Sequence, residues 1–267
     1  MNWSEEWQKL VMKSSIRRGW SLFFKENFVE WYDLQLEHNG YPGVLLDKVQ
    51  DHLNESSTVL DIGAGTGAFA IPIAREVKEV TVVEPSNKML IRLCSKMDDL
   101  TNIRLINKCW EDVNINEIGM HDMVIAVNSL YRIADVAVAL KKMLSVAKKY
   151  LYIIMECKSN FYKKMWQQIK KGKYHPTPSF IHLYNVLYEL GVFANVEIIK
   201  IPRSQIYLDI KQAVRHWLIR LDLPPEREDE LQVYLLRYLK ERDGTLYLEE
   251  EGQSAIIWCK KNDSLYC

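Results

Sequence analysis

The chain has 267 residues, of which 48% are hydrophobic, enough for one large α/β domain or two small ones. Basic and acidic residues number 35 each, and a formal net charge of zero argues against a dedicated nucleic-acid-binding protein. The N-terminus lacks a basic start followed by an apolar stretch, and no run approaches the roughly 18 apolar residues of a membrane helix. We therefore expect a cytoplasmic protein. Its five scattered cysteines form no CxxC pair, which predicts neither a metal site nor disulfide bonds.

Short apolar segments rich in β-branched residues follow an N-terminal helical region. Five of them have the length and composition of buried parallel strands: 58–62, 79–84, 103–107, 122–127 and 150–155. The intervening segments are long enough for crossover helices, such as 67–76 and 86–97. Strands that alternate with helices in this way predict an α/β fold with a doubly wound, mostly parallel sheet.

The second half of the chain predicts two further strands, at 195–201 and 254–260. Thr177-Pro178 is typical of a helix N-cap followed by a first-turn proline, and Gly191 is typical of the end of that helix. Segment 245–249 is expected to turn back through Glu251-Gly252 as an antiparallel hairpin. Segments 158–176 and 203–250 are interpreted as insertions in one domain that spans 1–267.

The most informative stretch is VLDIGAGTGA, at residues 59–68. A strand ends in an aspartate, three glycines follow within five positions, and a helical pattern begins. Glycine allows a tight turn and lets a ligand lie against bare backbone. A tight turn without a ligand would need only one glycine, so we interpret the stretch as a ligand-binding loop.

Two ligand classes fit this loop. Gly63-x-Gly65-x-x-Ala68 satisfies the dinucleotide fingerprint, and Glu84, about twenty residues on, could bind two ribose hydroxyls in either class. Asp61 favours S-adenosylmethionine (SAM), because its carboxylate would repel a pyrophosphate and attract the ammonium and sulfonium of SAM. The glycines and Glu84 by themselves leave both classes open.

The segments TVLDIGAGTG, VTVVEPS and CWED together resemble the class I SAM-dependent methyltransferases over about residues 57–157. The resemblance implies a seven-stranded sheet whose last strand is antiparallel, a cofactor-binding core at 57–157, an N-terminal helical lid at 1–56, and a C-terminal half at 158–267 with helical insertions. It also implies SAM as the cofactor.

The family resemblance further implies a role for each motif residue. Glu84, followed by Pro85, would bind the ribose, and Glu111 the adenine amino group. Trp110 would lie beside the adenine plane, although a core aromatic at this position remains an alternative. Asn128 would approach the methionine part. The backbone of the loop would hold the amino-acid end of the cofactor through Gly63, Ala64, Gly65, Thr66 and Gly67.

The acceptor is less well defined by the sequence. Asn128-Ser129-Leu130-Tyr131 is similar to the Asn-Pro-Pro-Tyr motif of enzymes that methylate base amines, but both prolines are missing. Tyr131 is therefore a candidate either for substrate contact or for closing the cofactor cavity. Tyr32 and Trp20, from an aromatic stripe at helical spacing, are candidates for a lid in which rings face the sulfonium.

Residues 158–174 alternate lysines with aromatics, and two interpretations remain open. The pattern fits a nucleic-acid patch, but Phe161, Met165 and Ile169 at four-residue spacing favour an amphipathic helix with solvated lysines. The six histidines show no pairing pattern, so no catalytic base is assigned; His182 and His216 are the ones placed to reach a cavity.

The sequence therefore predicts a methyltransferase that acts on a small molecule. The alternatives are an RNA, nucleobase or protein methyltransferase, and a non-catalytic SAM-binding protein. We expect no nucleic-acid or membrane partner, while the oligomeric state, a homodimer included, stays open.

Overall fold

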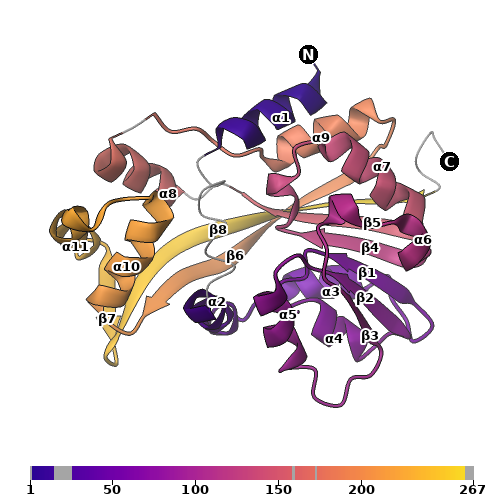
Figure 1. Cartoon of the computed structure of the whole chain (residues 1–267), viewed down its shortest axis with the longest axis horizontal. Coiled ribbons are helices and arrows are strands. Elements are labelled where there is room, and N and C mark those ends of the chain that lie inside the picture. Colours follow the sequence, from indigo (N-terminus) through magenta and orange to yellow (C-terminus); the bar gives the residue numbers. More distant parts are fainter. Residues whose placement is uncertain (1, 15–25, 158–159, 172, 262–267) are drawn as a thin grey trace.

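The computed structural model describes residues 2–14, 26–157, 160–171 and 173–261 (Figure 1). Its centre is one mixed sheet with the strand order β3-β2-β1-β4-β5-β8-β6, and β7 pairs with β8. The strands are β1 Thr58–Ile62, β2 Glu79–Val83, β3 Ile103–Ile106, β4 His121–Val127, β5 Ala147–Glu156, β6 Asn195–Tyr207, β7 Leu239–Arg242 and β8 Thr245–Lys260.

The first five strands are parallel, and β8 runs antiparallel to β5, β6 and β7. This confirms the mostly parallel sheet with an antiparallel last strand, to which β7 is an addition. The chain winds outward from β1 to β3 and then returns to place β4 on the other side of β1. The carboxyl ends of β1 and β4 are therefore the point where ligands bind in open α/β sheets.

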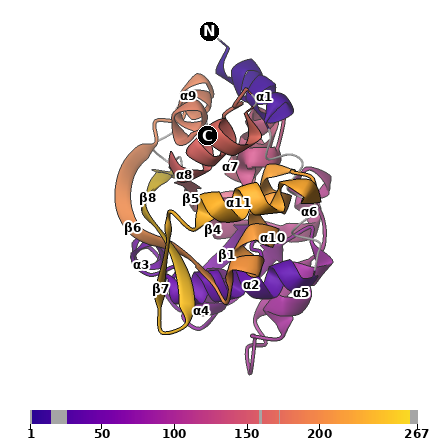
Figure 2. The same ribbon diagram turned by 90° about the vertical axis from the view of Figure 1, so that its left-hand side faces the viewer.

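Helices cover both faces of the sheet, as the end-on view shows (Figure 2). One face packs against α1 Trp3–Lys13, α6 Ile115–Ile118, α7 Val136–Val146 and α9 Phe180–Glu189. The other face packs against α3 Val44–Gln50, α4 Ala70–Ala74 and α5 Asn87–Cys94. The helix expected at 67–76 is thus shorter, because the glycine loop takes its first residues. No helix in the described part of the chain is both long and apolar enough to cross a membrane.

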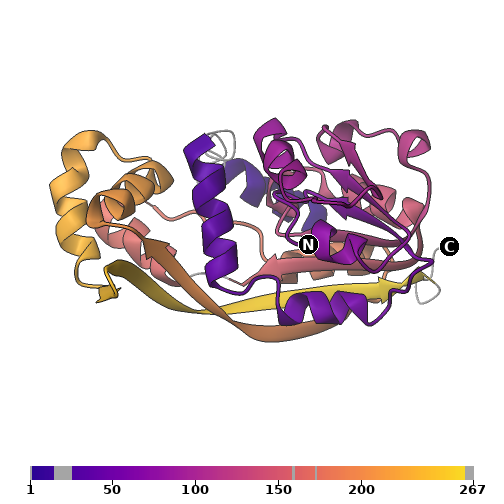
Figure 3. The ribbon, with the colours of Figure 1, turned by 90° about the horizontal axis from the view of Figure 1, so that it is seen from below.

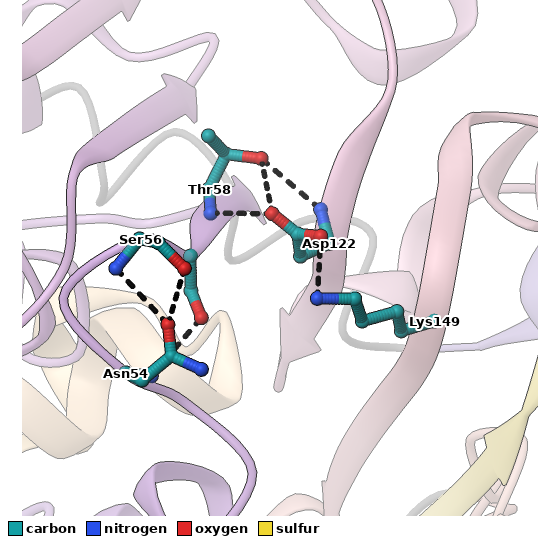
Figure 4. A network of polar contacts seen from close by, with 6 residues as sticks. Asn54, Ser56, Thr58, Asp122 and Lys149 are labelled. Atoms are coloured by element: carbon teal, nitrogen blue, oxygen red, sulfur yellow. Dashed lines mark hydrogen bonds and ion pairs between the residues drawn. The ribbon is translucent and has the colours of Figure 1, made fainter.

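The amino ends of three parallel strands are joined by one carboxylate (Figure 4). Asp122 Oδ2 accepts hydrogen bonds from the Thr58 backbone N–H at 2.9 Å and from the Thr58 hydroxyl at 3.1 Å. Lys149 Nζ lies 3.0 Å from Asp122 Oδ1. These bonds hold the pKa of Asp122 below its usual range. They fix the register of β1, β4 and β5 at the end of the sheet opposite the glycine loop.

Strands β6 and β8 continue well beyond the other strands as a long antiparallel pair (Figures 1 and 3). Their outer halves, with the helices and β7 that they carry, are called the arm. The arm has its own hydrophobic core, which includes Phe161, Met165, Ile169 and Trp217. The burial of the first three confirms the amphipathic helix expected there. The arm helices are α8 Asn160–Met165 with a π-helical turn at Trp166–Lys170, α10 Ile210–Leu221 and α11 Glu228–Leu235.

Helix α2, Glu26–His38, stands between the arm and the sheet (Figure 3) and is called the lid helix. Gln35 donates to the Ile206 carbonyl at 2.9 Å and accepts from the Ile206 N–H at 2.8 Å. Asn39 makes the same pair of bonds with Ser204, at 2.9 and 2.8 Å. One helical turn and two strand residues span similar lengths, so the two amides pair with alternate residues of the edge strand β6.

The prediction that 245–249 and 254–260 form a hairpin is wrong. Residues 245–260 form a single strand, and Gly252 lies inside it, opposite Ile201 of β6. A Cβ on Gly252 would lie 3.0 Å from Arg203 Cβ, so this glycine permits close strand packing rather than a turn. The turn is instead made by Asp243 and Gly244, both with positive φ, between β7 and β8.

The start of α9 also differs from the expectation at Thr177-Pro178. Ser179 is the N-cap, because it and His182 exchange hydrogen bonds in a capping box. Gly191, with a φ of +74°, follows the end of the helix as expected. Trp20 of the N-terminal aromatic stripe lies outside the described residues.

The amide pairing of the lid helix can be tested with Gln35→Met. The Ile206 N–H would lose its bond, and we expect the free energy of unfolding to fall by about 1–3 kcal/mol in urea denaturation. Glu37→Gln, on an exposed position of the same helix, is the control and should change little. A Gln35→Met variant as stable as the parent would contradict the link.

Candidate functional site

The loop after β1 is built from three glycines that serve different purposes. Gly63, Gly65 and Gly67 all have positive φ, at +77°, +58° and +84°. A Cβ on Gly63 would lie 2.3 Å from Ser129 Cβ, and one on Gly67 would lie 2.9 Å from Leu93 Cγ. A Cβ on Gly65 would meet nothing within 4 Å. Two glycines are therefore required by packing, and the third faces open space.

Glu84 lies at the carboxyl end of β2 and holds the loop from the side. Its carboxylate accepts hydrogen bonds from the backbone N–H groups of Gly65 and Ser86, each at 2.9 Å. Burial raises the pKa of Glu84, while these two bonds and the nearby Arg132 guanidinium oppose the rise. The sequence did not indicate that Arg132 lies near Glu84, because the two residues are 48 positions apart and no local pattern connects them.

Asp61 is the second carboxylate of the loop and is 1% exposed. Burial and the neighbouring charge of Glu84 raise its pKa to about 8. Within the described part of the chain, Asp61 Oδ2 has no hydrogen-bond partner. A buried polar atom without a partner is costly, and a cationic ligand would satisfy it.

The lid helix is attached to the loop by an ion-pair cluster that the sequence did not reveal. Asp33 is 2% exposed and accepts from the Thr66 hydroxyl at 2.6 Å. Arg92 Nε and Lys96 Nζ of the α5 region lie 2.7 and 2.8 Å from its two oxygens. These partners hold the pKa of Asp33 below its usual range. The stabilisation is therefore present at neutral pH and is lost as the pH falls through this lowered pKa.

Three tyrosines form an aromatic wall beside the two carboxylates: Tyr32 of the lid helix, Tyr41 and Tyr131. Burial raises the pKa of Tyr32 to about 12 and those of the other two well above their usual value. The charge of Glu156 raises all three, and that of Asp61 raises Tyr41. All three phenol groups therefore stay neutral, within reach of the charge of Glu156. Tyr41 was missed because it lies in a short turn without a motif.

Asn128 follows β4 with a φ of +51° and connects two loops. Its Oδ1 accepts from the Glu156 N–H at 2.8 Å and from the Tyr131 hydroxyl at 3.2 Å. The Tyr131 hydroxyl is also 3.2 Å from the Glu156 carbonyl. The ends of β4 and β5 are thereby held together at the wall, and the roles expected for Asn128 and Tyr131 stay predictions.

In the CWED segment after β3, Trp110 is buried whereas Glu111 is exposed. Trp110 is 3% exposed, its indole N–H points to the Ala139 carbonyl at 3.3 Å, and Lys142 Nζ lies 4.5 Å from its ring centroid. These contacts favour the core aromatic that the sequence left as an alternative. Glu111 is exposed and stays the predicted adenine contact. The Pro85 carbonyl accepts from Asn107 at 3.0 Å, which fixes the turn after Glu84.

The two histidines singled out from the sequence have other contacts. His182 caps α9, which packs on the same face of the sheet as α1 and α7. The His216 ring lies 2.8 Å from the Tyr207 hydroxyl within the arm. Among the described residues, no group of three or more His, Cys, Asp or Glu side chains could hold a metal ion.

The glycine loop lies inside a stretch that matches a known family model. Residues 59–150 match the model of a methyltransferase domain. An uncharacterized protein of Haemophilus influenzae is 28% identical over 151 residues, which is 56% of each chain. The match thus spans about half the length of that curated relative.

Solved structures share the fold at low sequence identity. A candidate methyltransferase of Bacillus halodurans has a TM-score of 0.57 and 18% identity, covering 82% of this chain and 99% of that one. A Haemonchus contortus phosphoethanolamine N-methyltransferase, solved with phosphomonomethylethanolamine and S-adenosylhomocysteine (SAH), has a TM-score of 0.54 and 14% identity, covering 88% and 57%. Together with the family match, these confirm the resemblance to class I SAM-dependent methyltransferases.

The different purposes of the glycines can be tested with Gly65→Val and Gly67→Val. Gly65→Val should cost about 1–2 kcal/mol for its positive φ and abolish SAM binding. The free energy of unfolding should fall by about 1–3 kcal/mol more in Gly67→Val, because the new side chain would be overpacked against Leu93. Thermal denaturation and calorimetry with SAM would check both. Normal SAM binding by Gly65→Val would mean that the ligand does not lie against this loop.

Proposed function

We propose that this chain, whose domain and fold are those of class I SAM-dependent methyltransferases, transfers the methyl group of SAM to a small-molecule acceptor. Because the curated relative is matched over only about half its length, the proposal rests on the site of this chain.

The observation that carries the proposal is the pair of buried carboxylates at a bare-backbone turn. Asp61 and Glu84 lie close enough that the charge of one raises the pKa of the other. Two carboxylates beside the loop disfavour the pyrophosphate of a dinucleotide and favour a cationic nucleoside. The unpartnered Oδ2 of Asp61 and the open side of Gly65 fit the amino-acid end of SAM.

The residues present therefore fit SAM in the order expected from the family. The loop backbone from Gly63 to Gly67 and Asp61 would hold its ammonium and carboxylate end, Glu84 its ribose, and Glu111 its adenine. When bound, SAM supplies an electrophilic methyl group on a sulfonium.

The chain contributes alignment and exclusion of water. The lid helix is held over the loop by Asp33, which brings Tyr32 to the aromatic wall. Neutral aromatic rings attract a sulfonium by cation–π interaction, worth about 0.5–2 kcal/mol. Holding two reactants in line can account for roughly 7–11 kcal/mol of a barrier. No general base is needed for an acceptor that already presents a lone pair.

Methylation of a nucleobase amine is less well supported. In that chemistry the asparagine amide oxygen accepts from the base amine, but Asn128 Oδ1 already accepts two hydrogen bonds. The lysines of the 158–174 stretch that were expected to face solvent, such as Lys163 and Lys164, are exposed on α8, while its apolar residues fill the core of the arm. Both observations favour a small-molecule acceptor over a nucleobase.

The cofactor can be tested by calorimetry with SAM and with NAD, followed by methyl-transfer assays on metabolite mixtures and RNA. SAM should bind and NAD should not. Glu84→Ala should weaken SAM binding by about 1–3 kcal/mol, because charge-assisted hydrogen bonds are lost. Glu76→Ala, which removes an exposed carboxylate, is the control. Tight SAM binding with no acceptor in any mixture would favour a non-catalytic SAM-binding protein.

SAM binding should also release protons below pH 8. The pKa of Asp61 is raised to about 8 in the free protein, so its carboxyl is largely protonated at pH 6.5. A bound cation favours the carboxylate and expels the proton, so the affinity for SAM should rise with pH up to about 8. Calorimetry at pH 6.5 in buffers of different ionisation enthalpy measures this release. Asp61→Asn should abolish it, and buffer-independent heats for the parent protein would refute the role of Asp61.

A further inference from the structure

A second set of charged residues lies on the arm side of the aromatic wall. Glu156 ends β5, and its backbone N–H and carbonyl contact Asn128 and Tyr131 at the wall. Its side chain forms an ion pair with Arg203 of β6. Arg220, on α10 of the arm, is near enough that its charge favours the ionised form of Glu156, while the charge of Arg203 lowers the pKa of Arg220. A row of polar groups thus continues from the predicted methyl-transfer site into the arm.

The carboxylates in this row are already engaged. Glu156 is the ion-pair partner of Arg203. Glu250 of β8, directly opposite Arg203 of β6, accepts a hydrogen bond from the Phe161 N–H at 3.0 Å. The first carboxylate thereby links β5 to β6, and the second links β8 to the start of α8.

Arg220 is in a different position. Its guanidinium carbon lies 5.2 Å from the ring centroid of Tyr162 and 5.0 Å from that of Trp217. Across residues 2–14, 26–157, 160–171 and 173–261, Arg220 makes no ion pair within 4 Å and no hydrogen bond. Arg220 is partly buried, and this burial together with the neighbouring Arg203 charge lowers its pKa.

A partly buried guanidinium that lies against two aromatic rings, with no ion pair or hydrogen bond to the described residues, keeps its five N–H donors available for a ligand. Carboxylates and phosphates match this fork of donors and form short, charge-assisted bonds with it. The rings of Tyr162 and Trp217 provide an apolar surface beside this guanidinium.

We propose that Arg220 is the anion-binding residue of the acceptor site, so that the methyl acceptor carries a carboxylate or a phosphate at the end remote from its reacting atom. The anionic group would lie on the arm, and the acceptor would extend past Glu156 to the aromatic wall. This inference rests on the proposed function for the reacting end, but the anion site itself can be tested without SAM.

The test is calorimetric titration with phenyl phosphate and benzoate, with benzyl alcohol as the uncharged probe. We expect the two anions to bind at least tenfold more tightly than the alcohol, and the preferred anion to identify the acidic group. Arg220→Met should weaken anion binding at least tenfold, and Arg220→Lys should restore part of it. Arg215→Met, an exposed arginine on the same helix, is the matched control and should change binding less than twofold.

Calorimetry with SAH on the same variants separates this inference from the proposed function. SAH affinity should be the same in the parent, Arg220→Met and Arg220→Lys. If SAH does not bind but the anions do, the cofactor assignment fails and the anion site stands. Anion binding equal in the parent and Arg220→Met, or no preference over benzyl alcohol, would overturn the inference. Thermal denaturation of each variant shows whether a loss of binding reflects a loss of folding.

Discussion

The structure depends on one electrostatic constraint, the burial of two carboxylates beside a turn of bare backbone. Asp61 and Glu84 are brought together because parallel strands β1 and β2 end at the same edge of the sheet. Glu84 is satisfied by two backbone N–H groups, whereas Asp61 keeps an unpartnered oxygen among the described residues and a raised pKa. The free protein therefore holds a buried polar atom in an unfavourable state that a bound cation would relieve. Ligand preference follows from this arrangement more directly than from the glycines, which dinucleotide-binding loops share.

The lid helix connects this constraint to the rest of the molecule. Asp33 attaches it to Thr66 in the loop, and Gln35 attaches it to the edge strand β6. One helix thus has polar contacts with the loop on one side and with β6 on the other. The same helix supplies Tyr32 to the aromatic wall, so the predicted cofactor site and the predicted acceptor site would share a boundary.

The arm gives the proposed acceptor site its character. It has a hydrophobic core of its own on the long β6–β8 pair, and it brings Arg203 and Arg220 near Glu156. Neutral tyrosines at one end and guanidinium groups at the other suit a molecule with an apolar or aromatic body and an acidic group. In this proposal Arg220, which has no ion pair within the described residues, is the group that would bind the acid.

The amino-acid sequence by itself determined the parallel core, because buried strands, the glycine turn and the acid after β2 are local patterns that one segment carries alone. It also determined the burial of Phe161, Met165 and Ile169, since helical spacing is a local property. Only the tertiary structure decided which side chains meet across the chain. Asp33 finds partners 33 to 63 positions away, and Arg220 approaches Glu156 across the arm. It also decided that Gly252 lies within a strand, because the space opposite a glycine depends on the neighbouring strand rather than on the residues beside it. Contacts of this kind have no periodicity in sequence, and the fold alone brings them together.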